Sequence, residues 1–354
     1  MRTTRALAEA GQSLWLDNIT RGLLDSGTLR RYIDELHVTG LTSNPTIYDK
    51  AIGGSDAYDA QVTASARAGR DGEETFFALA LDDLTRAADL FRPIHDRTDG
   101  VDGYVSLEVS PAIAYDTAAT VAQAQHLAGL AGRPNLLIKI PGTAQGLPAI
   151  EETILAGIPV NVTLLFSSAD VLASAEAYTR GIERRIAAGA SPAVASVASL
   201  FISRWDPYSA AALPESLRGR LGLAIGAQAH ADHVRFFSSP RWAALRAQGA
   251  RPQRLLFAST GTKDPAAPPT FYVAGLAAPD TVDTMPEETL LAAGAAEVPV
   301  TVLDPAGPDA LAPFRAAGYD LDAAAADLQR KGADAFVASW TSLLERITTK
   351  AAGA

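Results

Sequence analysis

Short apolar segments alternate with segments of helical periodicity along almost the whole chain, and this alternation limits the possible folds more than any other feature. Predicted strands occupy residues 13–18, 38–44, 103–111, 136–140, 158–166, 194–203 and 254–262. For an eighth strand, residues 279–285 are preferred over a rival at 298–303. Strands that alternate with helices are typical of a parallel sheet. Because no G-x-G-x-x-G fingerprint or P-loop is present, we predict an α/β fold, a closed (β/α)8 TIM barrel with additional helices, over an open sheet.

The chain length of 354 residues fits one large barrel or two ordinary domains. The strand pattern favours a single (β/α)8 barrel domain over residues 1–354. Two additions are expected: a helical excursion at about 46–102, with an exposed loop at 64–74, and a C-terminal packing helix at about 333–350. The last helix is predicted from Phe336, Trp340 and Leu343, which recur at helical spacing.

The composition excludes several classes of function. The net charge is -10 and no basic run stands out, so nucleic acid is not an expected partner. The chain has no cysteine, which excludes disulfides, cysteine-bound metals and thiol nucleophiles. No segment has the apolar length of a membrane-spanning helix, and residues 1–11 lack the pattern of a signal peptide. We therefore expect no membrane partner and a cytoplasmic location, while a monomer and a homodimer both stay open.

One lysine lies inside an otherwise apolar predicted strand. Residues 136–143 read Leu-Leu-Ile-Lys-Ile-Pro-Gly-Thr, and alternation across the strand puts Lys139 on the same face as Leu137. A buried ammonium is costly, so burial favours a neutral amine, and neutral amines attack carbonyls and form Schiff bases. Alternatively, the side chain reaches from the strand end to water or to one carboxylate. This segment alone slightly favours the second interpretation.

Polar residues near the carboxyl ends of the other predicted strands reverse that preference. Barrel enzymes form their active sites at this end, where a purely structural barrel would carry Val, Ile and Leu. The polar residues here are Asp17, Asn44, Glu108, Lys139, Asn161, Thr163, Ser203 and Ser259. Two carboxylates and a lysine among amides and hydroxyls are the groups that a Schiff-base enzyme needs for proton transfer and imine formation.

Seven motifs occur in a fixed order along nearly the whole chain. They are Ser-Leu-Trp-Leu-Asp-Asn at 13–18, Gly-Leu-Thr-Ser-Asn-Pro-Thr at 40–46, Leu-Glu-Val-Ser at 107–110, Leu-Ile-Lys-Ile-Pro-Gly-Thr at 137–143, Asn-Val-Thr-Leu-Leu-Phe-Ser at 161–167, Leu-Phe-Ile-Ser-Arg at 200–204 and Ala-Ser-Thr-Gly-Thr-Lys at 258–263. Any one motif alone is weak. In this combination the chain resembles the class I Schiff-base transaldolase family, in its longer actinobacterial-type form.

This resemblance implies a cofactor-free mechanism on sugar phosphates. Lys139 would attack the C2 ketone of sedoheptulose 7-phosphate or fructose 6-phosphate, and Asp17 would take the C4 hydroxyl proton. A dihydroxyacetone unit would then pass to glyceraldehyde 3-phosphate or erythrose 4-phosphate, a reaction of the non-oxidative pentose phosphate pathway. Glu108 and Thr163 would position a water for proton transfers. The remaining residues would bind the substrate, with Asn44, Asn161 and Ser203 at its hydroxyls and Ser259, Arg204 and Lys263 at its phosphate.

Several alternatives stay open from the sequence. Arg204 and Lys263 depart from the arginine positions of the better-known transaldolases, so a structural salt bridge is an equal alternative for both. A fructose 6-phosphate aldolase-type lyase is the nearest functional rival, although that group is much shorter. A sugar-phosphate binder without activity is disfavoured by the complete set of polar groups. No metal is expected, because the cluster His230, Asp232 and His233 is better explained as a solvated helix face.

Overall fold

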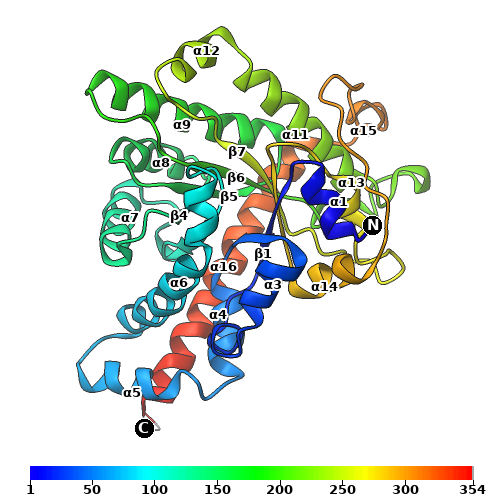
Figure 1. Ribbon diagram of the computed structural model, residues 1–354. Coiled ribbons are helices and arrows are strands. Elements are labelled where there is room, and N and C mark those ends of the chain that lie inside the picture. The colour runs from blue at the N-terminus through cyan, green and yellow to red at the C-terminus, as the bar shows by residue number, and fades with distance from the viewer. Residues whose placement is uncertain (353–354) are drawn as a thin grey trace.

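Eight parallel strands form a closed barrel in sequence order, with β8 paired to β1. The computed structural model describes residues 1–352. The strands are β1 (Ser13–Leu16), β2 (Val38–Leu41), β3 (Val105–Glu108), β4 (Leu136–Pro141), β5 (Val160–Leu165), β6 (Ser196–Phe201), β7 (Arg254–Ala258) and β8 (Val282–Met285). Helices surround the strands (Figure 1). The predicted (β/α)8 barrel with additional helices is therefore confirmed.

Most of the strands are shorter than the sequence suggested. β1 ends at Leu16, one residue before Asp17, and β2 ends at Leu41, three residues before Asn44. The eighth strand lies within the preferred segment, whereas in the rival segment Val302 forms an isolated bridge with Ala277. Several of the polar residues therefore follow the last paired residue of their strand, where their side chains are free to meet above the barrel.

The helices follow the strands on the outside of the barrel, as Figure 1 shows for α7, α8 and α9. In the part of the chain that the structure describes, no helix is long and apolar enough to cross a membrane. The helices are α1 (Thr3–Glu9), α2 (Arg21–Asp25), α3 (Thr28–Leu36), α4 (Pro45–Gly53), α5 (Asp59–Arg67), α6 (Gly72–Arg97), η1 (Pro111–Ile113), α7 (Thr117–Ala131), α8 (Gly146–Leu155), α9 (Ser168–Ala187), α10 (Trp205–Ser209), η2 (Glu215–Leu217), α11 (Leu221–Phe237), α12 (Pro240–Arg246), α13 (Phe271–Gly275), α14 (Glu287–Ala295), α15 (Ala312–Ala316) and α16 (Leu321–Ala352).

The excursion between β2 and β3 is helical, and its predicted loop at 64–74 was largely wrong. α5 continues to Arg67 and α6 already begins at Gly72. α6 begins there because Asp71 and Glu74 form a capping box, in which each side chain accepts a hydrogen bond from the other residue's backbone N–H. Small and polar residues suggested a loop, but the capping pair marks a helix start.

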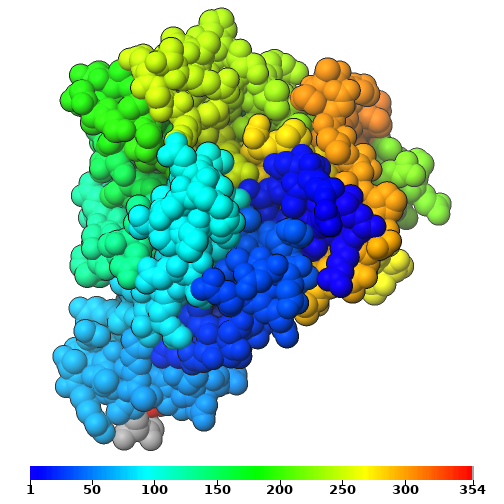
Figure 2. Space-filling model, in the orientation of Figure 1, coloured from blue at the N-terminus to red at the C-terminus, as the bar shows by residue number. Residues whose placement is uncertain are grey.

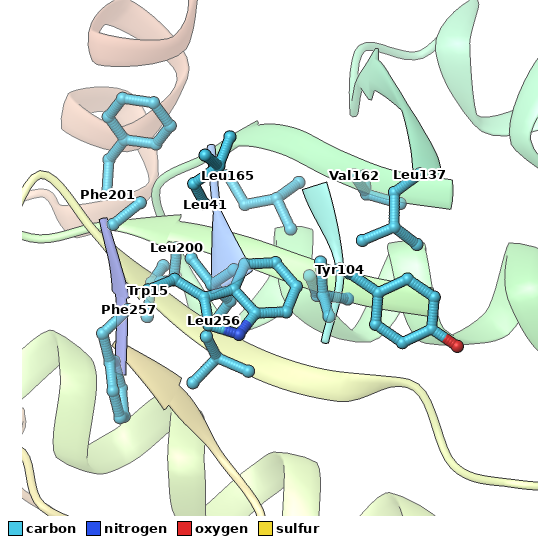
Figure 3. Packing of buried hydrophobic residues seen from close by; sticks show 14 of the residues in the cluster. Trp15, Leu41, Tyr104, Leu137, Val162, Leu165, Leu200, Phe201, Leu256 and Phe257 are labelled. Atoms are coloured by element: carbon cyan, nitrogen blue, oxygen red, sulfur yellow. The ribbon is translucent and has the colours of Figure 1, made fainter. Parts of the chain in front are cut away.

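Apolar side chains fill the barrel beneath its carboxyl end. Trp15, Leu137 and Leu256 are fully buried there, and Figure 3 shows all three. Each lies two residues before a residue that lines the cavity at the carboxyl end of the barrel, so strand alternation puts it one layer deeper on the same face. The Trp15 indole donates a 2.8 Å hydrogen bond to Asp102, which satisfies the one polar atom that the ring buries.

The last helix, α16, lies against the carboxyl end of the barrel and then runs along the helical excursion. It packs against β5 and η1 and also against α4, α5 and α6. Gln329 Nε2 donates to the carbonyl oxygens of Leu164 (2.9 Å) and Gly142 (3.2 Å), and Arg346 pairs with Asp49 of α4 at 2.7 Å. In Figure 2 the segments around α3 and α6 hide almost all of α16. The predicted helix at about 333–350 is thus part of a longer helix, whose inner face, with Phe336 and Leu343, is buried, while Lys331 and Val337 on its outer face are exposed.

Candidate active site

A cavity of about 280 Å³ opens at the carboxyl end of the barrel. Seven of the ten predicted site residues line it, while Glu108, Asn161 and Ser203 are buried behind its wall and bond to lining residues. The lining residues are Asp17, Thr42, Asn44, Thr46, Ile47, Lys50, Lys139, Thr163, Ser199, Phe201, Arg204, Ala258, Ser259, Lys263, Thr284 and Phe336. The sequence prediction therefore brought together residues that the fold does assemble.

A larger cavity of about 800 Å³ lies at the opposite, amino-terminal end of the barrel. Its lining is mainly apolar, with Val197 and Phe237 among its residues, and it contains none of the predicted site residues. Arg254 also lines it, but this guanidinium already donates to the Ser13 hydroxyl and the Thr281 carbonyl, each at 2.7 Å. The smaller cavity is the candidate active site because it holds the charged groups that can do chemistry.

Lys139 on β4 and Glu108 on β3 are register partners and form a buried ion pair. Lys139 Nζ lies 2.8 Å from Glu108 Oε2 and 3.0 Å from the Ser43 carbonyl oxygen. Burial raises the pKa of Glu108, and the charge of Lys139 and its hydrogen bond oppose that shift. Glu108 Oε1 has no hydrogen-bond partner among residues 1–352. A proton can therefore move between these two groups within one hydrogen bond.

Asp17 stands across the cavity from this pair and is held by hydroxyl groups. Thr42 Oγ1 donates to Asp17 Oδ1 at 2.8 Å, and Thr284 Oγ1 lies 2.7 Å from Thr42 Oγ1. Since Thr42 uses its proton on Asp17, Thr284 is the donor in the second bond. Burial raises the pKa of Asp17, while the charge of Lys139 and the Thr42 hydrogen bond lower it. The two carboxylates thus meet different partners, an ammonium for one and a hydroxyl for the other.

Asn161 on β5 is fixed by two serines inside the barrel. Its Nδ2 donates to Ser106 Oγ at 3.0 Å, and Ser199 Oγ donates to its Oδ1 at 2.7 Å. Asn161 is fully buried, whereas Ser199 lines the cavity. Thr163, two residues further along β5, also lines the cavity, and its hydroxyl has no hydrogen-bond partner in the described chain. Thr163 is therefore the β5 hydroxyl available to a ligand or water.

Asn44 caps the start of a helix and also lines the cavity. It is the N-cap of α4, and its Oδ1 accepts from the Ile47 backbone N–H at 3.0 Å. The proline at the next position fits the first turn of a helix, where its missing N–H is not needed. With Oδ1 occupied by the cap, the Nδ2 group of Asn44 remains to face the cavity.

Ser203 and Ser259 form a pair at the ends of β6 and β7. Their hydroxyl oxygens lie 3.0 Å apart, and the Ser203 N–H donates to the Ser259 carbonyl at 3.0 Å. Ser259 has φ 56°, a left-handed conformation that non-glycine residues rarely adopt. Such backbone strain concentrates at functional sites. Here it holds Ser259 in the cavity wall while Ser203 stays buried behind it.

Arg204 and Lys263 both line the cavity, next to the serine pair. Neither forms a salt bridge with a carboxylate within residues 1–352. The salt bridges that the sequence left open as an alternative role for these two cations are therefore not formed. The Arg204 guanidinium lies 5.0 Å from the centre of the Phe201 ring. Burial lowers the pKa of Arg204, opposed by the charge of Asp17. The positive charges of Arg204 and Lys263 are therefore available to bind an anion in the cavity.

Sequence reasoning missed several residues of this site. Ser106, Ser199 and Thr284 are polar residues on inward strand faces, so the alternation that identified the carboxylates could also have found them. Lys50 and Phe336 lie on α4 and α16, where no strand pattern points to them. Phe336 is 5% exposed, and its ring centre lies 5.4 Å from Lys139 Nζ. A helix that the sequence suggested only for packing therefore supplies a wall beside the lysine.

The solvated helix face expected for the histidines of α11 was wrong. His230 and His233 are both buried, and His233 Nε2 lies 2.7 Å from the Gln253 carbonyl. Burial lowers the pKa of His233 to about 4, so the ring is neutral at pH 7. Asp232 bonds to Ser168 instead. Within residues 1–352, no group of three or more potential metal ligands comes together.

The fold and the site define a (β/α)8-barrel protein with a buried, carboxylate-paired lysine at the carboxyl end of its strands. A family model described as Transaldolase/Fructose-6-phosphate aldolase matches residues 14–347. The chain belongs to this family.

Curated relatives match nearly the whole chain. A transaldolase of Thiobacillus denitrificans is 44% identical over 358 residues, covering 98% of this chain and 100% of the relative. A transaldolase of Acidothermus cellulolyticus is 45% identical over 362 residues, with 97% and 95% covered. A transaldolase of Thermobifida fusca is 44% identical over 364 residues, with 98% and 97% covered. All three relatives are named transaldolase, which agrees with the family that the sequence motifs suggested.

Proposed function

We propose that this protein is a transaldolase, which transfers a dihydroxyacetone unit between sugar phosphates through a Schiff base on Lys139. One observation carries the proposal: a buried lysine lies 2.8 Å from a carboxylate at the carboxyl end of the barrel, in a chain whose relatives are named transaldolase. The donors are sedoheptulose 7-phosphate and fructose 6-phosphate, and the acceptors are glyceraldehyde 3-phosphate and erythrose 4-phosphate. No observation favours the lyase alternative.

The first half of the reaction forms the imine. Glu108 accepts a proton from the Lys139 ammonium, along the 2.8 Å hydrogen bond, and the neutral amine attacks C2 of the ketose. Glu108 then gives a proton to the carbinolamine hydroxyl, which leaves as water. Burial raises the pKa of Glu108, which makes it a stronger base than an ordinary carboxylate and favours its taking the proton of the Lys139 ammonium. The unpartnered hydroxyl of Thr163 is placed to hold this water.

The second half breaks and remakes a carbon–carbon bond. Asp17 takes the proton of the C4 hydroxyl, the C3–C4 bond breaks, and its electron pair moves into the enamine on Lys139. The aldose phosphate leaves and a second aldehyde adds to C3, with Asp17 returning the proton to the new C4 oxygen. Hydrolysis of the imine then releases the product ketose. Asn44 binds the hydroxyls of the three-carbon unit, with Asn161 and Ser203 supporting from behind the wall.

Arg204 and Lys263, together with the Ser259 hydroxyl, are proposed to bind the substrate phosphate. Both cations line the cavity without a carboxylate partner among residues 1–352, and phosphate is an anion that guanidinium and ammonium groups bind well. Phosphorylated sugars cannot cross membranes unaided because of their charge, so we also propose a cytoplasmic location. A monomer and a homodimer are equally compatible with this site, which one chain completes.

Borohydride trapping tests the proposal directly. Reduction in the presence of fructose 6-phosphate should attach the three-carbon unit to Lys139, detected by peptide mass mapping. A Lys139→Met variant should show neither the adduct nor the transfer activity. The exposed Lys331, which pairs with Asp327 on the surface, provides the matched control, since Lys331→Met should label as the wild type does. An adduct on another lysine, or none, would refute the mechanism.

A further inference from the structure

The cavity at the amino-terminal end of the barrel has room for a molecule that the proposed transfer reaction does not use. Its volume of about 800 Å³ lies in the range of pockets that hold small ligands. Leu137 and Tyr104, both shown in Figure 3, are among its lining residues. The two cavities share no lining residue, so a ligand at this end is separate from the substrate at the other.

Apolar side chains form much of the wall and are also exposed at the mouth of this cavity. Val197 and Phe237 are buried in the wall. Val101 and Val302 line the cavity too, and they are 48% and 54% exposed. Exposed apolar side chains at a concave site mark a place where an apolar surface binds. The body of a ligand that fits here is therefore apolar.

His230 of α11 lines the cavity and forms no hydrogen bond within residues 1–352. Its side chain is only 3% exposed, and burial lowers its pKa, so the ring is neutral at pH 7. Nδ1 is fully enclosed and has no acceptor in reach, which leaves the ring proton on Nε2, toward the cavity. Because buried polar groups are nearly always hydrogen-bonded, this ring indicates that a ligand completes the wall.

Arg254 brings a positive charge into the same wall without touching a carboxylate of residues 1–352. Its guanidinium donates to four neutral oxygens, namely the carbonyls of Asp280 (3.1 Å), Val101 (3.2 Å) and Thr281 (2.7 Å) and the Ser13 hydroxyl (2.7 Å). A guanidinium has five N–H donors, so one N–H of Nη1 stays free. A buried charge without a counter-charge in contact costs free energy, and an anion in the cavity would offset that cost.

One hydrogen bond ties the helix that carries His230 to the start of β7. His233 Nε2 donates to the carbonyl oxygen of Gln253, the residue before Arg254, at 2.7 Å. His230 lies one turn earlier in α11, on the same face as His233. The free donors of His230 and Arg254 therefore belong to neighbouring elements of one wall.

The charge of the lining as a whole is positive, in a protein of net charge -10. Three arginines line the cavity, against the single carboxylate of Asp280. Arg251 pairs with Asp99 at 2.6 Å. Arg246 on α12 is exposed and has no salt bridge within residues 1–352, so its charge is available at the mouth. A positive cavity in an acidic protein attracts an anion.

We propose that this cavity binds a small molecule with an apolar body and a single carboxylate group, of the class of a medium-chain fatty acid. The apolar walls cover the body, and the N–H groups of Arg254 and His230 meet the carboxylate. A single negative charge fits better than a phosphate dianion, because two free donors in an apolar wall cannot replace the hydration of a double charge. The inference does not rest on the transaldolase activity.

The first test compares three probes on the wild-type protein by isothermal titration calorimetry. Octanoate carries both the apolar body and the carboxylate, 1-octanol only the body, and acetate only the carboxylate. Octanoate should bind saturably to one site. 1-Octanol should bind about 10-fold more weakly, since it lacks the charged hydrogen bonds, and acetate should show no measurable binding.

The second test locates the site with variants. His230→Phe keeps a ring and removes its N–H, so octanoate affinity should fall about 10-fold while 1-octanol affinity is unchanged. His126→Phe is the matched control, because His126 is an exposed residue of α7 outside the cavity. Val234→Trp, which fills the cavity from α11, should abolish binding of both probes.

Three results would overturn the inference. Octanoate that does not saturate shows that there is no site, and 1-octanol that binds as tightly as octanoate shows that no anion is recognised. Octanoate that binds His230→Phe and Val234→Trp as it binds the wild type occupies another place. Thermal melting checks that each variant is folded, and the comparison of probes on the wild type decides the matter even if a variant fails to fold.

Discussion

At the scale of single residues, the site contains two buried carboxyl groups, Asp17 and Glu108. Burial raises the pKa of both, but they have different hydrogen-bond partners. Glu108 touches the lysine nitrogen, and Asp17 touches a threonine hydroxyl. A group in contact with the amine is suited to proton transfer at nitrogen. A group held at a distance from the amine is suited to a hydroxyl further along the substrate. The proposed mechanism therefore assigns imine formation to Glu108 and bond cleavage to Asp17.

Substitution of each carboxyl group should stop the reaction at a different stage. Asp17→Asn should still form the imine with fructose 6-phosphate but cleave it slowly, so an uncleaved six-carbon adduct accumulates. Glu108→Gln should be slow even to form the imine. Each change should lower the affected step roughly 10²–10⁴-fold, as for a positioned acid or base. Mass spectrometry of borohydride-reduced samples over time distinguishes six-carbon from three-carbon adducts on Lys139.

The wild-type protein is the reference for this comparison, and Lys331→Gln serves as a control for substitution in itself. If Asp17→Asn gives mainly the three-carbon adduct at the wild-type rate, Asp17 does not act at the C4 hydroxyl. If Glu108→Gln forms adduct as fast as the wild type, the contact with Lys139 serves stability alone.

Functional residues could be predicted from the sequence where a charged side chain interrupts an apolar strand pattern. Lys139 and Glu108 stood out because charged side chains are rare on apolar strands. Lys50 did not, because a lysine on a surface helix is ordinary and only the closed barrel brings it over the cavity. For Asn161 the sequence indicated an inward amide, but the two serines that hold it come from β3 and β6. Contacts between strands far apart in sequence depend on the register of the barrel.

At the scale of elements, α16 does more than pack. Its Gln329 bonds to the carbonyl of Leu164, a residue at φ 59° beside an irregularity in the pairing of β5 with β6. Two turns later, Phe336 lines the cavity next to Lys139. The same helix thus supports a strained strand end and limits the access of water to the amine.

Removal of the Phe336 ring should change the fate of the enamine. Phe336→Ala should let water reach C3 of the three-carbon unit, which would then be protonated and released as dihydroxyacetone. The ratio of dihydroxyacetone released to units transferred should rise several-fold, because water competes with the aldehyde once the wall is open. The measurement is an enzyme-coupled assay of free dihydroxyacetone beside the transfer assay.

Leu343→Ala is the matched control, since Leu343 is a fully buried residue of the same helix that does not line the cavity. Both variants lose core packing, about 2–5 kcal/mol for a large-to-alanine change. Only Phe336→Ala should alter the product ratio. A similar ratio in both variants would mean that the ring has no role in excluding water.

Element positions could be predicted well and their ends less well. Apolar runs located the barrel strands, but the ends depend on where pairing with a neighbour stops, as β2 shows by ending at Leu41. The segment 64–74 was predicted as a loop from its small residues, although Asp71 and Glu74 cap a helix there. His230 and His233 were predicted on a solvent-exposed helix face, but both are buried. Which side of α11 faces the barrel is decided by tertiary packing, which the sequence pattern does not show.

At the scale of the whole molecule, a buried carboxyl group outside the catalytic cavity links stability to pH. Asp283 lies on β8, one residue before Thr284, whose side chain lines the cavity, so Asp283 points the other way, toward the surrounding helices. Thr260 donates to its Oδ1 at 2.8 Å, and Oδ2 has no partner within residues 1–352. Burial raises the pKa of Asp283 to about 7.

This raised pKa predicts that stability falls as pH rises. An unfolded chain loses the Asp283 proton near pH 4, whereas the folded protein keeps it to about pH 7, so the stabilising contribution is lost as pH increases through that window. Between pH 5 and pH 8 the loss from this group is roughly 2–3 kcal/mol at about 1.4 kcal/mol per pH unit. Asp283→Asn imitates the protonated form and should remove that part of the slope.

Urea denaturation of both proteins at pH 5 and pH 8 measures the effect. The variant should gain stability relative to the wild type between pH 5 and pH 8, whatever its absolute stability at either pH. Asp327→Asn, on the surface of α16, is the control substitution and should not show this gain. A wild-type slope that persists in Asp283→Asn would assign the pH dependence to other groups.

The position of α16 after all eight strands has a consequence for protein synthesis. The ribosome makes the chain from its amino terminus, so a nascent chain exposes the barrel strands before Gln329 and Phe336 emerge. Such a chain already contains Lys139 and both carboxylates, but the wall beside the lysine is missing. The cavity can therefore close only after α16, the last helix to be synthesised, has docked. A chain released before that point carries Lys139 and the two carboxylates without the helix that limits the access of water to them.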